Sequence, residues 1–178
     1  MKKKRTLLND QDFKRIITRM SHEIIEKHKG TQNLGLVGIQ TRGDFLAKRI
    51  ADQIRKIEAV PLPVGSMDIN MYRDDWTKIS RQPIVRPSNI PFSVDDMDII
   101  LVDDVLFTGR TIRAAMDALM DFGRPSRIEL AILVDRGHRE LPIQADYKGI
   151  SINTDHQDRI NVLVAEHDKQ DLVYIGQD

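Results

Sequence analysis

Apolar residues near the start of the chain recur with helical spacing. Within residues 10–29 they fall three or four positions apart and so share one face of an amphipathic helix; they are Phe13, Ile16, Ile17, Met20 and Ile24. Asn9 or Asp10 can cap its start, because a short polar side chain accepts a hydrogen bond from a backbone N–H of the first turn. Gly30 ends the pattern. The sequence therefore predicts a helix with one buried and one polar face.

The apolar runs farther along the chain are short and indicate buried strands. The main ones are residues 34–39, 98–103 and 127–134. Helical periodicity resumes after the first run, between Phe45 and Ile54, and after the second, over 109–122. Further short strands are expected toward the end of the chain. Strands that alternate with helices predict an α/β fold whose sheet is covered by helices on both faces.

Two segments interrupt this alternation. Residues 59–69 contain two prolines and are predicted to be an edge strand, since proline cannot donate to the hydrogen-bond ladder of a sheet. Residues 71–96 are charged and interrupted by prolines, with no sustained period. They predict a long loop or a weak hairpin, and loops of this length are usually functional or mobile.

Composition narrows the class of protein. A chain of 178 residues with 40% apolar and 30% charged residues is typical of one globular domain, here spanning 1–178. The net charge of +0 means that any nucleic-acid surface must be a local basic patch. Without cysteine there is no disulfide framework, which suits the cytoplasm. The basic start, Lys2 to Arg5, precedes no apolar span, so we expect no membrane association.

The strongest chemical signal is "DIILVDDVLFTGRT" at residues 98–111. Its Thr-Gly-Arg-Thr turn precedes a helix, so backbone N–H groups can hold a phosphate, and Gly109 lets that backbone approach closely. The adjacent Asp103 and Asp104 would repel a bare phosphate but accept hydrogen bonds from vicinal hydroxyls. The combination suits a sugar phosphate such as ribose 5-phosphate. The alternative is that Asp104 caps a helix and the turn is only a turn.

This motif resembles the phosphoribosyl pyrophosphate (PRPP) motif of type I phosphoribosyltransferases. Together with "ITRMSHEIIE", "VGIQTRG", "MYRDDW", "GRPSRIELAILVDRGHRELPI" and "ADYKG" it resembles the bacterial family of bifunctional pyrimidine operon attenuation regulators and uracil phosphoribosyltransferases (PyrR-type). The likeness runs from about residue 6 to the end. It implies the type I phosphoribosyltransferase fold, a mostly parallel sheet flanked by helices, with a small hood and a flexible flap over 71–96.

The resemblance implies transfer of uracil onto ribose C1 of PRPP, which releases pyrophosphate and yields UMP. Mg²⁺ would be carried by PRPP, with no protein ligand assigned. Catalytic roles fall to Arg42, Asp103 and Asp104. PRPP would be bound by Thr41, Arg42, Gly43, Arg86, Asp103, Asp104, Val105, Leu106, Phe107, Thr108, Gly109, Arg110 and Thr111. A non-proline cis peptide is expected at or near Thr41–Arg42. As a plain turn residue, Arg42 would simply be solvated.

Uracil or its nucleotide is assigned by the resemblance to a second loop. The residues are Val134, Asp135 and Arg136, where backbone groups and the arginine would read the base. The alternative is that Asp135 and Arg136 merely pair with each other at a strand end.

The same resemblance implies binding of pyrimidine-gene leader mRNA when UMP is bound, which attenuates transcription. Arg and His side chains would contact phosphates and unpaired bases. The residues are Thr18, Arg19, His22, His138, Arg139 and Thr154. The first three also fit an ordinary solvated helix face. Gln144 and Ile150 stand where a basic residue is usual, and this departure predicts weaker RNA binding.

Three functions remain open at this point. The first is a uracil phosphoribosyltransferase that also regulates by binding RNA. The second is an RNA-binding regulator that only senses PRPP or nucleotides, and the third is a plain or purine-type phosphoribosyltransferase. The resemblance further implies a homodimer or a higher homo-oligomer.

Overall fold

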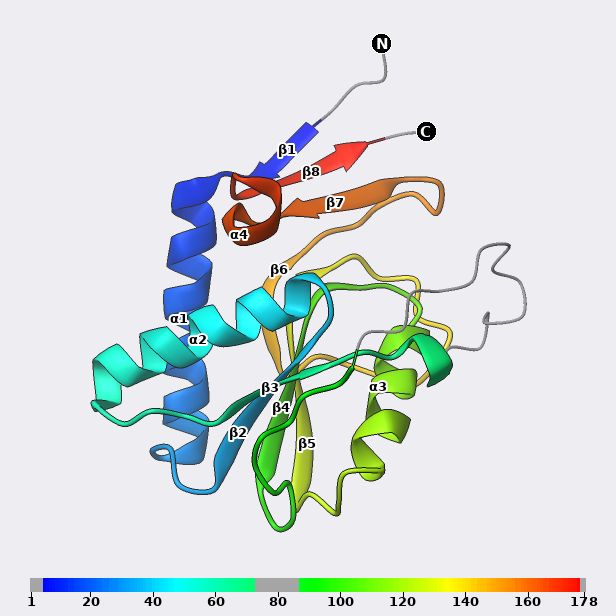
Figure 1. The fold of residues 1–178 in the computed structure, drawn as a ribbon. Coiled ribbons are helices and arrows are strands. Elements are labelled where there is room, and N and C mark those ends of the chain that lie inside the picture. The colour runs from blue at the N-terminus through cyan, green and yellow to red at the C-terminus, as the bar shows by residue number, and fades with distance from the viewer. Residues whose placement is uncertain (1–4, 73–86, 177–178) are drawn as a thin grey trace.

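The computed structural model describes residues 5–72 and 87–176. Its main sheet has five parallel strands in the order β3-β2-β4-β5-β6 (Figure 1). These strands are β2 (Leu34–Ile39), β3 (Val64–Met67), β4 (Asp98–Leu106), β5 (Arg127–Asp135) and β6 (Tyr147–Ser151). The parallel order places the carboxyl ends of all five strands at one edge of the sheet, where ligands of such folds collect.

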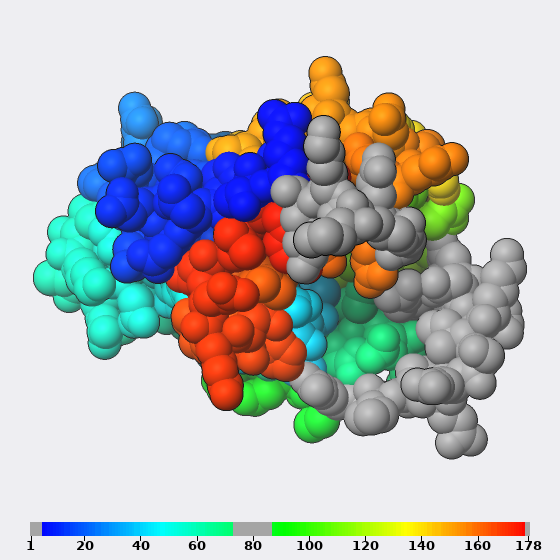
Figure 2. Space-filling view, turned by 90° about the horizontal axis from the view of Figure 1, so that it is seen from above, coloured from blue at the N-terminus to red at the C-terminus, as the bar shows by residue number. Residues whose placement is uncertain are grey.

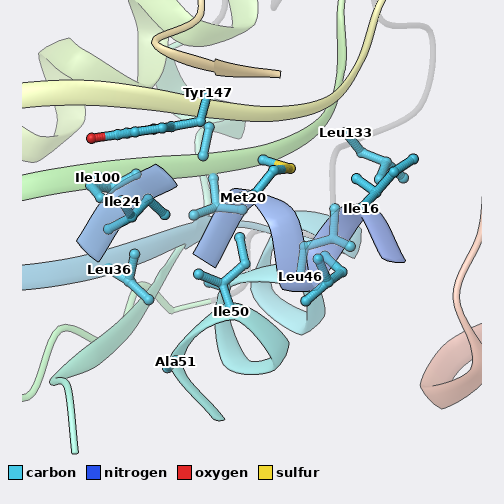
Figure 3. Close-up of a cluster of buried hydrophobic side chains, with 14 of the residues drawn as sticks. Ile16, Met20, Ile24, Leu36, Leu46, Ile50, Ala51, Ile100, Leu133 and Tyr147 are labelled. Atoms are coloured by element: carbon cyan, nitrogen blue, oxygen red, sulfur yellow. The ribbon is translucent and has the colours of Figure 1, made fainter. Parts of the chain in front are cut away.

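Helices cover both faces of this sheet, as the apolar pattern predicts. Helix α1 (Asp10–His28) and helix α2 (Arg42–Glu58) pack on one face, and α3 (Arg110–Met120) packs on the other (Figure 1). Figure 3 shows the interface of α1 and α2 with the sheet, where side chains of both helices meet those of the strands. Its labelled members are Ile16, Met20, Ile24, Leu36, Leu46, Ile50, Ala51, Ile100, Leu133 and Tyr147.

Local signals set the ends of α1 where the sequence placed them. The Asn9 side chain accepts a hydrogen bond from the backbone of Asp12, whose carboxylate bonds back to Asn9 N–H. At the other end Lys29 takes a left-handed conformation with φ of 53°, and Gly30 follows. The predicted helix over 10–29 is therefore confirmed to within one residue.

The C-terminal strands do not extend the main sheet. β7 (Arg159–Leu163) and β8 (Leu172–Gly176) form an antiparallel sheet with β1 (Arg5–Leu8), in the order β1-β8-β7. With α4 (Ala165–Asp168) they make up the hood, which lies at the carboxyl edge of the main sheet and brings the two ends of the chain together (Figure 1).

Segment 59–69 is outermost in the main sheet, which confirms the edge position predicted from its prolines. Within this segment, only β3 is a strand of the sheet, and it begins directly after Pro61 and Pro63. Of the predicted loop 71–96, Met71 and Tyr72 belong to a short 3-10 turn that begins at Asn70, and residues 73–86 lie outside the described part. No helix in the described ranges is long and apolar enough to cross a membrane.

Candidate active site

A cavity of about 260 Å³ lies at the carboxyl ends of β2, β3 and β4. Seen from the hood side, the surface is hollowed beside the red C-terminal segment (Figure 2). The cavity is lined by Ile39, Gln40, Thr41, Arg42, Asp68, Ile69, Asn70, Asp103, Asp104, Val105 and Thr111. Residues from two predicted motifs and from the end of β3 therefore meet in one polar space.

The two adjacent aspartates lie within β4, which continues to Leu106 rather than ending at 103. Asp103 is 8% exposed, and its Oδ1 accepts a hydrogen bond of 2.9 Å from the N–H of Asp104. Burial, and then the charge of Asp104, raise the pKa of Asp103 well above its usual range. Burial also raises the pKa of Asp104, although the positive charge of Arg42 opposes that rise. The pair is thus an acceptor site whose negative charge is poorly solvated.

The turn between β4 and α3 carries the predicted phosphate site. Gly109 precedes the helix with a φ of 93°, a left-handed value that favours glycine. First-turn N–H groups of such a helix bind phosphate, and Thr111 of this turn lies in the cavity wall. The loop after β5 holds the turn from behind: Arg136 N–H donates to the Leu106 carbonyl at 3.1 Å, and Glu140 N–H donates to the Thr108 carbonyl at 2.9 Å.

The predicted pyrophosphate loop follows β2. Its cis peptide joins Gln40 and Thr41. The cis bond was expected at or near Thr41–Arg42, and the observed bond is the one directly before it. Gly43 lies against β4, and a Cβ there would come within 2.3 Å of the Val102 carbonyl oxygen. Only glycine therefore lets this loop approach the strand that carries the aspartates.

Arg42 is held by the hood and is not a solvated turn residue. Its Nε and Nη2 atoms donate to the Asp168 carboxylate at 3.1 and 2.9 Å. The carboxylate also accepts a hydrogen bond from Val164 N–H at 2.9 Å. Sequence reasoning missed Asp168, because only the fold brings residue 168 next to residue 42.

The residues predicted for uracil are not among those that line this cavity. Val134 is buried in β5, and Asp135 pairs with Arg139 at 2.6 Å. Arg136 is 6% exposed and donates to the carbonyls of loop 155–158. The ion partner of Asp135 is thus Arg139. The alternative drawn from the sequence, that Asp135 and Arg136 merely pair with each other, is therefore wrong. Burial lowers the pKa of Arg136.

Of the residues predicted to contact RNA, three lie on α1. His22 is exposed, whereas Thr18 donates its hydroxyl to the Lys14 carbonyl within the helix. Arg19 pairs with Glu23, and its Nη2 also donates to carbonyls of edge strand β6 at 2.9 and 2.6 Å. Arg19 therefore links the exposed face of α1 to the open edge of the sheet.

The other three lie together beyond β5 and β6. His138 Nε2 is 2.6 Å from the Thr154 carbonyl oxygen, so this nitrogen carries the proton. Arg139 donates to the carbonyls of Ile143 and Phe107 at 2.9 and 2.8 Å, in addition to its pair with Asp135. Thus His138 and Thr154 contact each other, and Arg139 is bound within its own loop.

The two departures from basic residues lie in different surroundings. Gln144 is exposed, whereas Ile150 packs against the apolar cluster below α1. Ile150 therefore contributes to the core of this chain.

Two further lining residues escaped the sequence analysis. Asp68 and Asn70 reach the cavity from the carboxyl end of β3, and Asn70 N–H donates to Asp68 Oδ1 at 2.9 Å. Ligands collect beyond the carboxyl ends of parallel strands. This rule could have identified both residues if the loop after 59–69 had been considered along with the loops after the other strands. Arg86, predicted to reach pyrophosphate, lies outside the described residues. Across residues 5–72 and 87–176, no group of three or more His, Asp or Glu side chains could hold a metal ion.

Comparison with known proteins agrees with this geometry. A family model described as phosphoribosyl transferase domain matches residues 4–168. Proteins named Bifunctional protein PyrR from Bacillus mycoides (strain KBAB4) and Bacillus cereus (strain B4264) are 55% identical over 177 residues, which cover 98% of each chain.

Solved structures share the fold at lower identity. A hypoxanthine phosphoribosyltransferase from Staphylococcus aureus has a TM-score of 0.70 at 21% identity, over 97% of this chain and 91% of that one. The enzyme of the same name from Trypanosoma cruzi has a TM-score of 0.73 at 14% identity, over 98% and 97%. Likeness at this level concerns the fold and not the base that is bound.

Proposed function

This chain belongs to the phosphoribosyl transferase family and to its bifunctional PyrR group, and from that membership we propose a uracil phosphoribosyltransferase that also regulates pyrimidine genes. The reaction joins uracil N1 to ribose C1 of PRPP and releases pyrophosphate. One observation carries the proposal. Adjacent carboxylates, a helix N-terminus and the loop after β2 line a single cavity, and these are the groups that ribose hydroxyls, a 5-phosphate and a pyrophosphate require.

Each part of PRPP has a complementary wall. Asp103 and Asp104 accept hydrogen bonds from the two ribose hydroxyls, and the first turn of α3 binds the 5-phosphate. The backbone at Thr41 and the guanidinium of Arg42 face the pyrophosphate, whose negative charge grows as it leaves. Mg²⁺ bound with PRPP would offset part of that charge, and the carboxylates lining the cavity, which could hold it, are oxygen donors of the kind that Mg²⁺ prefers.

The assignment of uracil to residues 134–136 rests on the resemblance, because Val134 is buried and Arg136 N–H already donates to the Leu106 carbonyl. The Arg136 side chain donates to the carbonyls of loop 155–158, so its guanidinium is already engaged. A pyrimidine presents a C=O, an N–H and a second C=O along one edge, so residues 134–136 must expose complementary backbone groups in order to bind it.

Measurement of UMP formation tests the enzymatic proposal. Purified protein is incubated with uracil, PRPP and Mg²⁺, and parallel reactions contain hypoxanthine or guanine. Turnover with uracil alone is expected. Turnover only with the purines would make the protein a purine-type enzyme, and no turnover with any base would leave a nucleotide sensor.

RNA binding is the second part of the proposal. His22 is exposed on α1, and His138 and Thr154 form a contact beyond β5. A gel shift with pyrimidine-operon leader RNA is expected to tighten when UMP is added. Ile150 is uncharged and packs against the core. The RNA affinity should therefore depend less steeply on salt concentration than that of a protein with a basic residue at this position. If no shift occurs with or without UMP, the protein is an enzyme only.

We also propose that the chain self-associates. Three large apolar side chains are exposed around the end of α3 and the neighbouring 3-10 turn, namely Met71 at 69%, Met120 at 55% and Phe122 at 43%. Exposed apolar groups that lie together favour association. Sedimentation velocity should show a dimer or a larger species at micromolar concentration, and a monomer would contradict the proposal.

A further inference from the structure

The phosphate turn carries an aromatic side chain that is packed among a guanidinium and two imidazoles. Phe107 follows the last residue of β4 and precedes Thr108 and Gly109. Its ring lies 4.1 Å from the guanidinium carbon of Arg136. The rings of His138 and His156 meet it edge-on, with centroids 5.9 and 5.4 Å away.

These contacts join the phosphate turn to two later loops. The centroids of the two imidazoles are only 4.8 Å apart, although they come from opposite ends of β6. His138 is bound to the Thr154 carbonyl, and Arg136 donates to the carbonyls of Asp155 and Asp158 at 3.0 and 2.8 Å. Loop 154–158 is therefore held by the same residues that surround Phe107.

The backbone at His138 shows that this arrangement is constrained. His138 has a φ of 61°, in the left-handed region that non-glycine residues rarely adopt, and Gly137 before it has a φ of 78°. A residue stays in such a conformation only when its surroundings determine it. Here the hydrogen bond to Thr154 and the contact with Phe107 supply that determination.

We propose that Phe107 transmits occupancy of the phosphate turn to the pair His138–His156, and that this pair is where a bound nucleotide changes the affinity of the chain for RNA. The inference rests on the proposed regulatory function and adds His156 to the residues that the sequence indicated.

The physical basis is the packing of the ring. When a nucleotide phosphate binds the N–H groups of residues 108–111, the backbone that carries Phe107 adjusts. A packed aromatic cluster responds by changing between discrete arrangements rather than by bending continuously. The two imidazoles and the Thr154 carbonyl then move together, because His138 is hydrogen-bonded to Thr154 and its ring contacts that of His156.

Nuclear magnetic resonance tests the transmission without RNA. The imidazole signals of His138 and His156 are assigned with His138→Gln and His156→Gln, and UMP is then titrated. Both signals are expected to shift in the wild-type protein. In Phe107→Leu, measured at a UMP concentration that saturates the variant, the shifts should be lost. Unmoved signals in the wild type, or shifts that persist in Phe107→Leu, would overturn the inference.

RNA affinity tests the consequence. The ratio of leader-RNA Kd without UMP to that with UMP is expected to be at least about fivefold in the wild type. In His156→Ala it should fall to within about twofold of one. By thermodynamic reciprocity, RNA should tighten UMP binding by the same factor as UMP tightens RNA binding. A variant that binds RNA more weakly in both states, with the ratio preserved, would make His156 only an RNA contact and would refute transmission.

The chain offers a matched control in His167. It is also an exposed histidine beside a phenylalanine, since its ring stacks on Phe45 with centroids 6.4 Å apart. His167→Ala should keep the wild-type ratio, and an equal loss of coupling there would count against the inference. If wild-type protein binds no leader RNA, the regulatory function and the RNA half of the inference both fall, while UMP formation still decides the enzymatic proposal.

Discussion

At the scale of single residues, Asp103 combines a proposed role in ribose binding with an unfavourable environment. It is buried beside a second carboxyl, and both conditions raise its pKa. A carboxyl whose pKa is raised by folding binds its proton more tightly in the folded protein. It therefore destabilises the fold progressively as the pH rises above its pKa in the unfolded chain. The site thus retains a charge that the fold would be more stable without.

Replacement of Asp103 by asparagine should separate these two effects. The amide oxygen can still accept the hydrogen bond from Asp104 N–H, but the charge is gone. We expect a Tm a few degrees higher at pH 7, with a smaller gain at lower pH. We expect kcat/KM for PRPP to fall about 10- to 100-fold, because hydrogen bonds to charged groups are worth about 1.5–3 kcal/mol.

Calorimetry at pH 5 and 7 and initial rates measure the two outcomes. Asp52→Asn, at an exposed carboxylate on α2, is the control and should change neither. A lower Tm for Asp103→Asn at pH 7 would show that the buried charge is fully compensated.

Arg42 offers a second test at this scale. Its planar fork binds both oxygens of Asp168, a geometry that lysine cannot reproduce. Arg42→Lys keeps the charge but should lower kcat/KM for PRPP by about tenfold or more, since the cation is no longer oriented by the hood. Arg55→Lys, on the exposed side of α2, is the matched control for steady-state kinetics. Wild-type kinetics in Arg42→Lys would mean that charge alone suffices.

At the scale of elements, a buried carboxylate joins α1 to β5 and β6. Glu129 of β5 is 3% exposed and receives hydrogen bonds from Tyr147 at 2.6 Å and His28 at 2.9 Å. Lys27 pairs with it at 2.9 Å. Burial alone would raise the pKa of Glu129, but these partners outweigh it and lower the pKa to about 2. The end of the first helix is therefore attached to the sheet by charge as well as by apolar packing.

Glu129→Gln should lower the free energy of unfolding by about 3 kcal/mol at pH 7, because it leaves buried partners without their charge. A lowered folded-state pKa contributes stability above the unfolded value of about 4.3, and this is lost as the pH falls toward 2. The difference between variant and wild type should therefore shrink between pH 5 and 2. Urea denaturation measures it, with exposed Glu26→Gln as control. A difference independent of pH would contradict the charge argument.

At the scale of the whole molecule, the hood is attached to the core through α2. Arg49 donates to Glu166 at 2.8 Å and twice to Asp171 at 2.8 Å. Its guanidinium also lies 5.2 Å from the centre of the Phe13 ring on α1. Arg49, a residue of α2, thus contacts both the hood and α1.

Arg49→Lys should loosen the hood without unfolding the sheet. Lysine cannot bind two carboxylates in this geometry. We therefore expect the free energy that holds the hood to the core to fall by about 2 kcal/mol. Hydrogen exchange followed by mass spectrometry should show faster exchange in β7 and β8, with β4 and β5 unchanged. Equal acceleration throughout would mean that the hood and the sheet unfold as one unit.

Periodicity and turn residues were sufficient for much of the fold. The three longer helices, the order of strand and helix, and the edge position of 59–69 are local properties, because spacing and capping act over a few residues. The short helix α4 was not predicted. Hood strands β7 and β8 were expected, but neither β1 nor the separate antiparallel sheet was, since pairing of β1 with β8 joins opposite ends of the chain. Local patterns carry no information about such partners.

The same division holds for the site. The sequence by itself determined that Asp103, Asp104 and the turn at 108–111 lie together, because they are neighbours in the chain, and it indicated the PRPP site from them. Only the tertiary structure decided that Arg42 meets Asp168, that Asp68 enters the cavity, and that Arg136 faces loop 155–158 and Phe107. These contacts depend on how distant strands align and where loops cross, which the packing of the whole chain settles.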